Sequence, residues 1–289
     1  MKLAYRNNQY PIRNIPSRFP SMNIIKTPRN RVLGSLGRLG ALAAILVVPI
    51  AKAAVFDVVV YGSDAIFLAG RTDVTIPPAD QPWTGPGTHL IRHPSATPEE
   101  IRETVPPFLS VTGGDVVKVA DPAVGGVNFY NDYGPPFFGP GGNGLSGSSL
   151  TSLDGISGYL GPQGPLVGVF LDDSIPSSGP APATLNFTPG GLGIDFLRLE
   201  PALRQVFYIG DGVTSGNVFQ EFIAPAGATR LFLGIPDGFG FNGAPGAYDD
   251  NDGSYMVRIG INQDPNIPEP VSMGVLALGL LGWTFFRRR

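Results

Sequence analysis

The chain has 289 residues, a formal net charge of −3 and no cysteine, so its stability must come from packing or bound ions. Its basic residues gather towards the two ends, which leaves the part between them acidic. Nucleic acid is therefore excluded as a partner, because phosphate binding needs a basic face. The 40 glycines and 30 prolines alternate with short apolar runs and predict turns between strands.

The N-terminal region predicts an export signal. Basic residues precede an apolar stretch at 39–50, which is followed by the small-residue pattern of Ala51 and Ala53, so we expect signal peptidase to cleave after Ala53. The apolar stretch is too short to span a bilayer, since a membrane helix needs about 20 residues. The first 21 residues fit neither a signal nor a folded element, so Met22 is the expected start; an unusually long signal is the alternative.

The region after the signal predicts an all-β fold with the rhythm of a β-sandwich. Short runs rich in Val, Ile, Phe and Tyr recur between Gly, Pro, Asn and Asp residues. The expected strands are 55–61, 65–69, 107–112, 115–120, 127–130, 166–172, 194–200, 205–209, 218–223, 229–235 and 254–261.

Three further features complete this part of the chain. A cap, a proline and two acids predict a helix of about two turns from residue 97. The segment 54–107 is expected to be an N-terminal extension of the main β-domain, 108–261, with a small separate domain as the alternative. The Gly-rich stretches 134–149 and 176–191 are expected to be long loops.

The stretch 233–259 carries the strongest chemical signal, because it contains an acid-rich loop between two strands. Its carboxylates, amides and glycines offer the oxygen ligands that calcium prefers. The spacing from Asp249 to Gly253 does not match an EF-hand loop. A solvated hairpin turn is the alternative, since Asp, Asn and Gly favour turns in any case.

This loop resembles the C-terminal part of the small galactophilic, calcium-dependent bacterial lectins. Asp237 matches the first acid of that pattern, Pro245-Gly246 its turn, and Asp250-Asn251 its asparagine pair. The upstream elements Gly114-Asp115 and Tyr133-Gly134-Pro135 are similar to the glycine-aspartate strand and the Tyr-Gly-Pro loop of the family. The match requires an insertion after Asp237.

The resemblance implies a jelly-roll-like β-sandwich that binds carbohydrate through calcium. Asp237, Asp250 and Asn251 would supply side-chain oxygens, and Tyr133 and Ala247 backbone carbonyls, while sugar hydroxyls complete the calcium shell. The chain departs from the family in the loop after Tyr-Gly-Pro, which has no histidine, and its only glutamine there stands in a different context. Galactose specificity is therefore left open.

Four phenylalanines lie in the two loops that would surround the ion: Phe137, Phe138, Phe239 and Phe241. An aromatic ring packs well on the apolar face of a pyranose, so Phe239 is a candidate ligand-binding residue beside Asp237 and Asp250. Buried anchors of the loops are the alternative for all four.

The sequence offers no pattern for catalysis, and we expect no enzyme. His89 and His93 have metal-ligand spacing, but Pro94 follows and no third ligand is near, so they are interpreted as exposed loop residues. Asp172 and Asp173 end a strand without an opposing carboxylate, which favours turn capping over glycan hydrolysis.

The region 262–289 is a polar linker followed by a sorting tail. A Pro-Glu-Pro motif precedes the apolar run 271–286, and three arginines close the chain. This order resembles the PEP-CTERM sorting signal, which is recognised by an exosortase. The apolar helix would lie in the membrane, with the three arginines on the cytoplasmic side. The motif residues are Pro268, Glu269, Pro270, Arg287, Arg288 and Arg289.

Together these features predict an exported protein that is anchored for a time in the inner membrane and then reaches the cell surface or extracellular matrix. The expected role is calcium-dependent binding of exopolysaccharide or galactoside-like glycans. A structural matrix protein, in which calcium only stabilises loops, is the alternative.

Overall fold

The computed structural model describes residues 53–73, 103–129 and 135–266, and these residues form an all-β fold. The described part of the chain contains twelve strands in three sheets and four short 3-10 helices, and no α-helix. This confirms the all-β prediction, and the arrangement is consistent with a β-sandwich. The helix expected from residue 97 lies outside the described residues.

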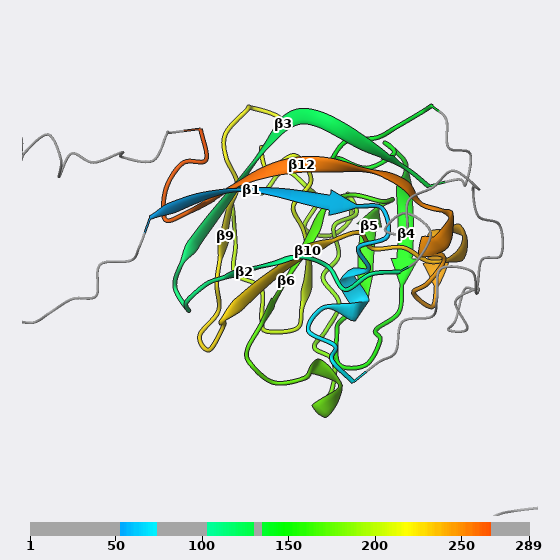
Figure 1. Cartoon of the computed structure of the whole chain (residues 1–289), viewed down its shortest axis with the longest axis horizontal. Helices are drawn as coiled ribbons and strands as arrows, with labels where there is room; N and C mark the ends of the chain where they lie inside the picture. The colour runs from blue at the N-terminus through cyan, green and yellow to red at the C-terminus, as the bar shows by residue number, and fades with distance from the viewer. Residues whose placement is uncertain (1–52, 74–102, 130–134, 267–289) are drawn as a thin grey trace, which may run out of the picture. The chain divides into compact units, whose positions relative to one another are not determined.

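The first sheet has five strands in the order β1, β12, β3, β9, β7. Their bounds are Ala54–Tyr61 for β1, Asp252–Ile261 for β12, Val116–Asn128 for β3, Glu221–Ile223 for β9 and Arg198–Leu199 for β7. Strand β12 pairs antiparallel with both β1 and β3, and the three run side by side in Figure 1. The pairing of β12 with β3 is interrupted at Asp121–Ala123, where β3 has extra residues and accommodates Pro122.

The second sheet has four antiparallel strands in the order β2, β10, β6, β8. Their bounds are Phe108–Ser110 for β2, Arg230–Gly234 for β10, Val167–Leu171 for β6 and Val206–Tyr208 for β8. Every residue of β6 is buried, which explains why its sequence is apolar throughout rather than alternating.

The third sheet is small and has the order β11, β4, β5. Its strands are Asn242–Gly243 for β11, Ser146–Leu150 for β4 and Tyr159–Pro162 for β5. Strands β4 and β5 pair antiparallel, and β11 adds to β4 in parallel.

A core of aromatic and branched side chains joins the first two sheets. Phe207 of β8 lies 5.1 Å, centroid to centroid, from Phe170 of β6 and 5.3 Å from Phe222 of β9, so its ring contacts both sheets. On β12 the alternate residues from Tyr255 to Ile261 are buried, whereas Met256 and Arg258 are only partly buried on the outer face. Burial of each apolar side chain contributes about 2 kcal/mol.

Four predicted elements differ from the structure. The run 65–69 forms the 3-10 helix η1 (Ile66–Leu68) instead of a strand, because its residues are buried together in the core and do not alternate. The separate strands expected at 115–120 and 127–130 are the two ends of β3. The predicted loop 134–149 contains the start of β4, whose Ser- and Gly-rich sequence gives no strand signal.

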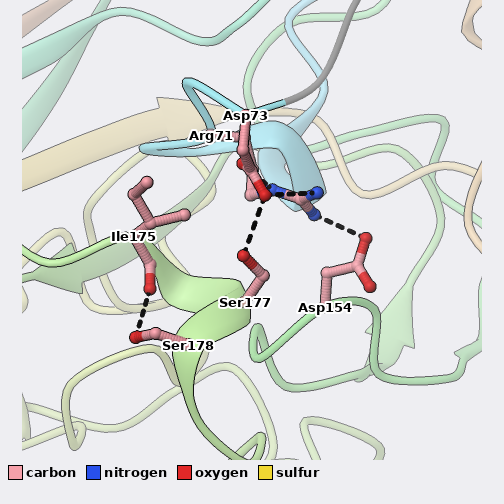
Figure 2. A network of polar contacts seen from close by, with 6 residues as sticks. All are labelled: Arg71, Asp73, Asp154, Ile175, Ser177 and Ser178. Carbon is pink, nitrogen blue, oxygen red and sulfur yellow. Dashed lines mark hydrogen bonds and ion pairs between the residues drawn. The ribbon is translucent and has the colours of Figure 1, made fainter.

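A buried arginine ties three loops together (Figure 2). Arg71 forms ion pairs with Asp73 at 2.7 Å and with Asp154 at 2.5 Å, and Ser177 of η2 (Pro176–Ser178) donates a hydrogen bond to Asp73. In η2, the Ser178 hydroxyl donates to the carbonyl of Ile175. This network connects residues that follow η1 with the turn before β5 and the loop after β6.

No helix within the described ranges is long and apolar enough to cross a membrane. The expected sorting tail, residues 267–289, lies outside these ranges, as does Ala51 of the expected cleavage site. Ala53 is described and exposed, and β1 begins at the next residue.

Candidate functional site

The acid-rich loop predicted from sequence connects β10 with β12. It contains two 3-10 helices, η3 (Phe239–Phe241) and η4 (Tyr248–Asp250), with β11 between them. Ala247 has a left-handed backbone (φ 64°), as has Phe241 (φ 56°), a rare conformation for a bulky residue. The Phe241 ring packs edge-on against Phe129 of the segment after β3, which holds the loop in this conformation.

Asp237 is buried at the start of this loop, and amide donors hold its carboxylate. The backbone N–H of Gly238 donates to Oδ1 at 2.7 Å, and the side-chain amide of Asn251 donates to Oδ2 at 2.8 Å. A buried carboxylate needs such hydrogen bonds, because desolvation otherwise disfavours its charge. The structure therefore brings Asp237 and Asn251 together, although 14 residues separate them.

Asn251 also connects the loop to the end of β1. Its Nδ2 donates a second hydrogen bond, of 3.0 Å, to the carbonyl of Gly62. The side chain is fully buried, and its Oδ1 has no hydrogen-bond partner among the described residues. Asn251 thus directs its amide hydrogens, not its oxygen, at Asp237.

Tyr248 fixes the other side of the loop. Its hydroxyl donates to the carbonyl of Ile235 at 2.7 Å and accepts the N–H of Asp237 at 3.1 Å. Burial, together with the charge of Asp237, raises the pKa of Tyr248 well above its usual value. The hydroxyl therefore stays protonated and keeps its role as a donor at any ordinary pH.

A pocket of about 470 Å³ opens beside these residues, and we call it the Asp237 pocket. Its walls combine two carboxylates, one amide side chain and several apolar groups. The lining residues are Phe129, Leu145, Gln163, Asp237, Gly238, Phe239, Gly240, Phe241, Ala247 and Asp250. Phe239 is the most exposed large apolar side chain of the described residues, at 65%.

Four of the predicted site residues meet in this pocket: Asp237, Ala247, Asp250 and Phe239. Asn251 is not among the lining residues and supports Asp237 by its hydrogen bond. Tyr133 lies outside the described residues, as do His89 and His93.

Sequence reasoning missed part of the pocket. Gln163 lines it, and its Oε1 accepts a hydrogen bond of 3.1 Å from the amide of Asn143. Leu145, which precedes β4, forms another part of the wall. The Gly-rich composition around Gln163 and Leu145 is the sequence signal that could have indicated them, since glycines flank the hairpin to which both belong.

The other phenylalanines have structural roles. The Phe138 ring stacks on Phe129 with 6.0 Å between centroids, and its backbone pairs with Val127 of β3. Phe137 packs on Gly126 so closely that a Cβ there would lie 2.8 Å from the Cβ of Phe137. Phe241 is thus a buried loop anchor and Phe138 a partly buried one, whereas Phe137 is 47% exposed and does not fit the alternative of a buried anchor.

Asp172 and Asp173 are bound locally. The hydroxyl of Ser174 donates a hydrogen bond to Asp172 and, with the backbone N–H of the same residue, lowers the pKa of Asp172. Asp173 accepts a hydrogen bond from the Thr229 hydroxyl. These contacts place the two carboxylates in turns, which supports the turn-capping interpretation over acid-base catalysis.

The described ranges contain no group of three or more His, Cys, Asp or Glu side chains placed to hold a metal ion. Calcium also accepts amide and carbonyl oxygens, so two carboxylates with backbone oxygens are a donor set of the right chemistry. Asp237, Asp250 and Ala247 line the Asp237 pocket, and they are the residues that would hold the ion.

Comparison with known proteins gives no relative: no family model, curated protein or solved structure matches this chain.

Proposed function

We propose that this chain is an exported, exosortase-sorted protein whose jelly-roll-like β-sandwich binds carbohydrate in the Asp237 pocket. The part between the expected signals is the glycan-binding module, and its place of work is the cell surface or the extracellular matrix. Signal peptidase, the export machinery and the exosortase are its processing partners, and the C-terminal helix holds it in the membrane before processing.

The observation that carries the proposal is the composition of the pocket wall. Phe239 presents an exposed ring, and the carboxylates of Asp237 and Asp250 and the amide of Gln163 line the same pocket. Sugars present apolar C–H faces together with hydroxyl groups, so an aromatic ring beside hydrogen-bond acceptors is suited to them. A volume of about 470 Å³ is within the range of small-ligand sites, about 300–1,000 Å³.

Calcium is the proposed cofactor, with Asp237, Asp250 and the carbonyl of Ala247 as its protein ligands. Asn251 would then not bind the ion, and its hydrogen bond to Asp237 would orient the carboxylate, since metal-binding carboxylates are usually hydrogen-bonded to a further group. When bound, the ion would supply positive charge and open positions for sugar hydroxyls. Asn251 could itself become a ligand only by releasing its bonds to Asp237 and Gly62.

Export is supported by the position of β1. Cleavage after Ala53 would leave Ala54 as the first residue, and Ala54 is also the first residue of the edge strand β1. The mature chain would therefore begin directly with folded structure.

A second candidate function is a structural matrix role without a sugar ligand. It is favoured by the hydrogen bonds that tie the 237–251 loop to its own surroundings, from Asn251 to Gly62 and from Tyr248 to Ile235. In that case calcium would stabilise the loop alone.

The two functions are distinguished by titrating calcium into the purified protein and then adding simple galactosides or cell-free exopolysaccharide from the producing cells. The glycan-binding proposal expects heat from both additions, and at least a tenfold weaker sugar affinity in Phe239→Ala. Leu197→Ala, another largely exposed apolar side chain outside the pocket, is the matched control and should bind normally.

The proposal fails if no glycan binds at millimolar calcium. Calcium binding without sugar, with a lower melting temperature in chelator, would support the structural alternative. Asp250→Asn should weaken calcium binding in either case, because it removes one carboxylate charge from the pocket.

A further inference from the structure

The edge strand β1 presents an open surface for another strand. It pairs with β12 without interruption over all eight of its residues, from Ala54 opposite Ile261 to Tyr61 opposite Ser254. No described strand pairs with its other side. In Figure 1, β1 accordingly lies beside β12 as the outermost strand of the first sheet.

The register shows which backbone groups point outwards. Gly62 donates its N–H to the carbonyl of Gly253, so the even-numbered residues of β1 face β12 and the odd-numbered residues face away. Tyr61 fits this alternation, because its N–H donates to the Asp64 carboxylate and its carbonyl accepts the N–H of Asp64, so neither group binds β12. Val55, Asp57 and Val59 therefore direct their N–H and carbonyl groups to the open side.

Among the described residues, β1 has few of the usual features that protect an edge. Its sequence contains no proline or lysine, and its ladder with β12 has no bulge. Its one charge, on Asp57, is matched by Arg258 at 2.7 Å and 3.1 Å. Phe56 and Val59 remain 39% and 46% exposed, which is high for large apolar side chains on a strand.

The exposed segment is self-complementary. Residues 55–59 read Val-Phe-Asp-Val-Val, with apolar residues on both sides of a central aspartate. A two-fold axis at Asp57 would set Val55 opposite Val59 of the second copy, and Phe56 opposite Val58. All three outward-facing residues would then meet in hydrogen-bonded pairs.

We propose that two copies of this chain associate through antiparallel pairing of their β1 strands, centred on Asp57. The five-stranded first sheets of the two copies become one continuous sheet, and the interface is the same patch on both copies. The exposed ring of Phe56 is covered by Val58 of the second copy.

The charges permit a second copy as the occupant, for which the self-complementary sequence of residues 55–59 argues. Two aspartates would face one another across the axis, and like charges in this position are normally destabilising. Each carries its own Arg258 on the neighbouring strand, so the centre of the interface holds two negative and two positive groups.

The test is the mass of the full-length protein in detergent, measured by light scattering with correction for the detergent. The proposal expects twice the chain mass of 30.4 kDa. Val59→Pro removes one outward N–H and leaves the β12 ladder intact, and it should return the mass to that of one chain. A single-chain mass for the unaltered protein, or a dimer that persists in Val59→Pro, would overturn the proposal.

A second pair of variants guards against misfolding of the proline variant. Val59→Lys keeps the N–H but adds an edge charge, and it should also give a single chain. Val124→Lys places the same charge at a similarly exposed valine on β3, two strands inside the sheet, and should remain a dimer. Equal behaviour of the two lysine variants would contradict edge pairing.

Cross-linking tests the register. Because the chain has no cysteine, Asp57→Cys introduces a single thiol, which should form an intermolecular disulfide under mild oxidation. Val124→Cys should not form one. Cross-linking of Val124→Cys but not of Asp57→Cys would place the interface elsewhere and overturn the proposal.

Discussion

The two edges of the first sheet are built in opposite ways. Strand β7 at one edge has only two residues, and its Arg198 forms ion pairs with Glu200 at 3.0 Å and with Glu221 at 3.5 Å. Pro201 follows soon after. Strand β1 at the other edge has eight residues and one charge, which Arg258 neutralises.

Among the described residues, only the β7 edge of the sheet combines a short strand with exposed charges. A short strand with charges and a nearby proline offers few hydrogen-bonding groups to another chain. A long, regular and apolar strand offers a row of outward-facing N–H and carbonyl groups to another chain. Association through β1 therefore requires no change in the fold of either copy.

The largest effect on the free energy of unfolding is expected for a substitution in β12, the strand that pairs with β1. Ile259 of β12 is fully buried opposite Phe56, and we expect Ile259→Ala to lower the free energy of unfolding by about 4 kcal/mol, because it leaves a cavity. Met256→Ala, on the outer face of the same strand, should cost less than about 1 kcal/mol. Urea unfolding of both variants measures the difference, and equal losses would show that the outer face is also covered.

The next effect concerns Asp64, which binds Tyr61 at the end of the open β1 edge. Burial raises the pKa of Asp64 to about 6 from 3.8, although hydrogen bonds from Thr104 and Tyr61 oppose the shift. The folded chain thus keeps a proton that the unfolded chain releases at lower pH. The contribution of Asp64 to stability falls by about 3 kcal/mol as the pH rises from about 4 to 6, and changes little above that.

Asp64→Asn removes this titration, and chemical unfolding at several pH values measures it. The difference in stability between the unaltered protein and the variant should change with pH only across this window. A difference that is constant between pH 4 and 7 would contradict the raised pKa.

The smallest effect is expected at the protected edge. Arg198 is half exposed, so we expect Arg198→Ala to cost only about 0.5 kcal/mol in the free energy of unfolding, an effect that salt reduces. The variant should have the same mass as the unaltered protein in light scattering, because two residues are too few to pair with another chain. New association through β7 would show that its charges, and not its length, protect this edge.

Local sequence patterns predicted most of the strands but not all of them. Val- and Phe-rich runs such as those of β6 and β10 were found because burial favours branched and aromatic side chains. Strand β4 was missed because Ser and Gly carry no such signal, and its pairing with β5 decides its conformation. The run 65–69 is apolar because it is buried, which a helical turn satisfies as well as a strand.

The candidate site was predicted in its residue types and only partly in its geometry. The acids and glycines of the 237–251 loop indicated a polar site, and Asp237 and Asp250 do share a pocket. The orientation of Asn251 could not be predicted, because it depends on the carbonyl of Gly62, 189 residues away. The position of Gln163 in the pocket could not be predicted either, because Gln163 belongs to another hairpin.

The sequence by itself determined the all-β character, the turns and the acid-rich loop, since these depend on the preferences of residues close together in the chain. Only the tertiary structure decided which strands are edges and which are central. Ala54 pairs with Ile261, at the far end of the described chain, and no local pattern specifies a partner so distant. That long-range pairing puts β1 at the edge of the sheet, where no other described strand pairs with its second side.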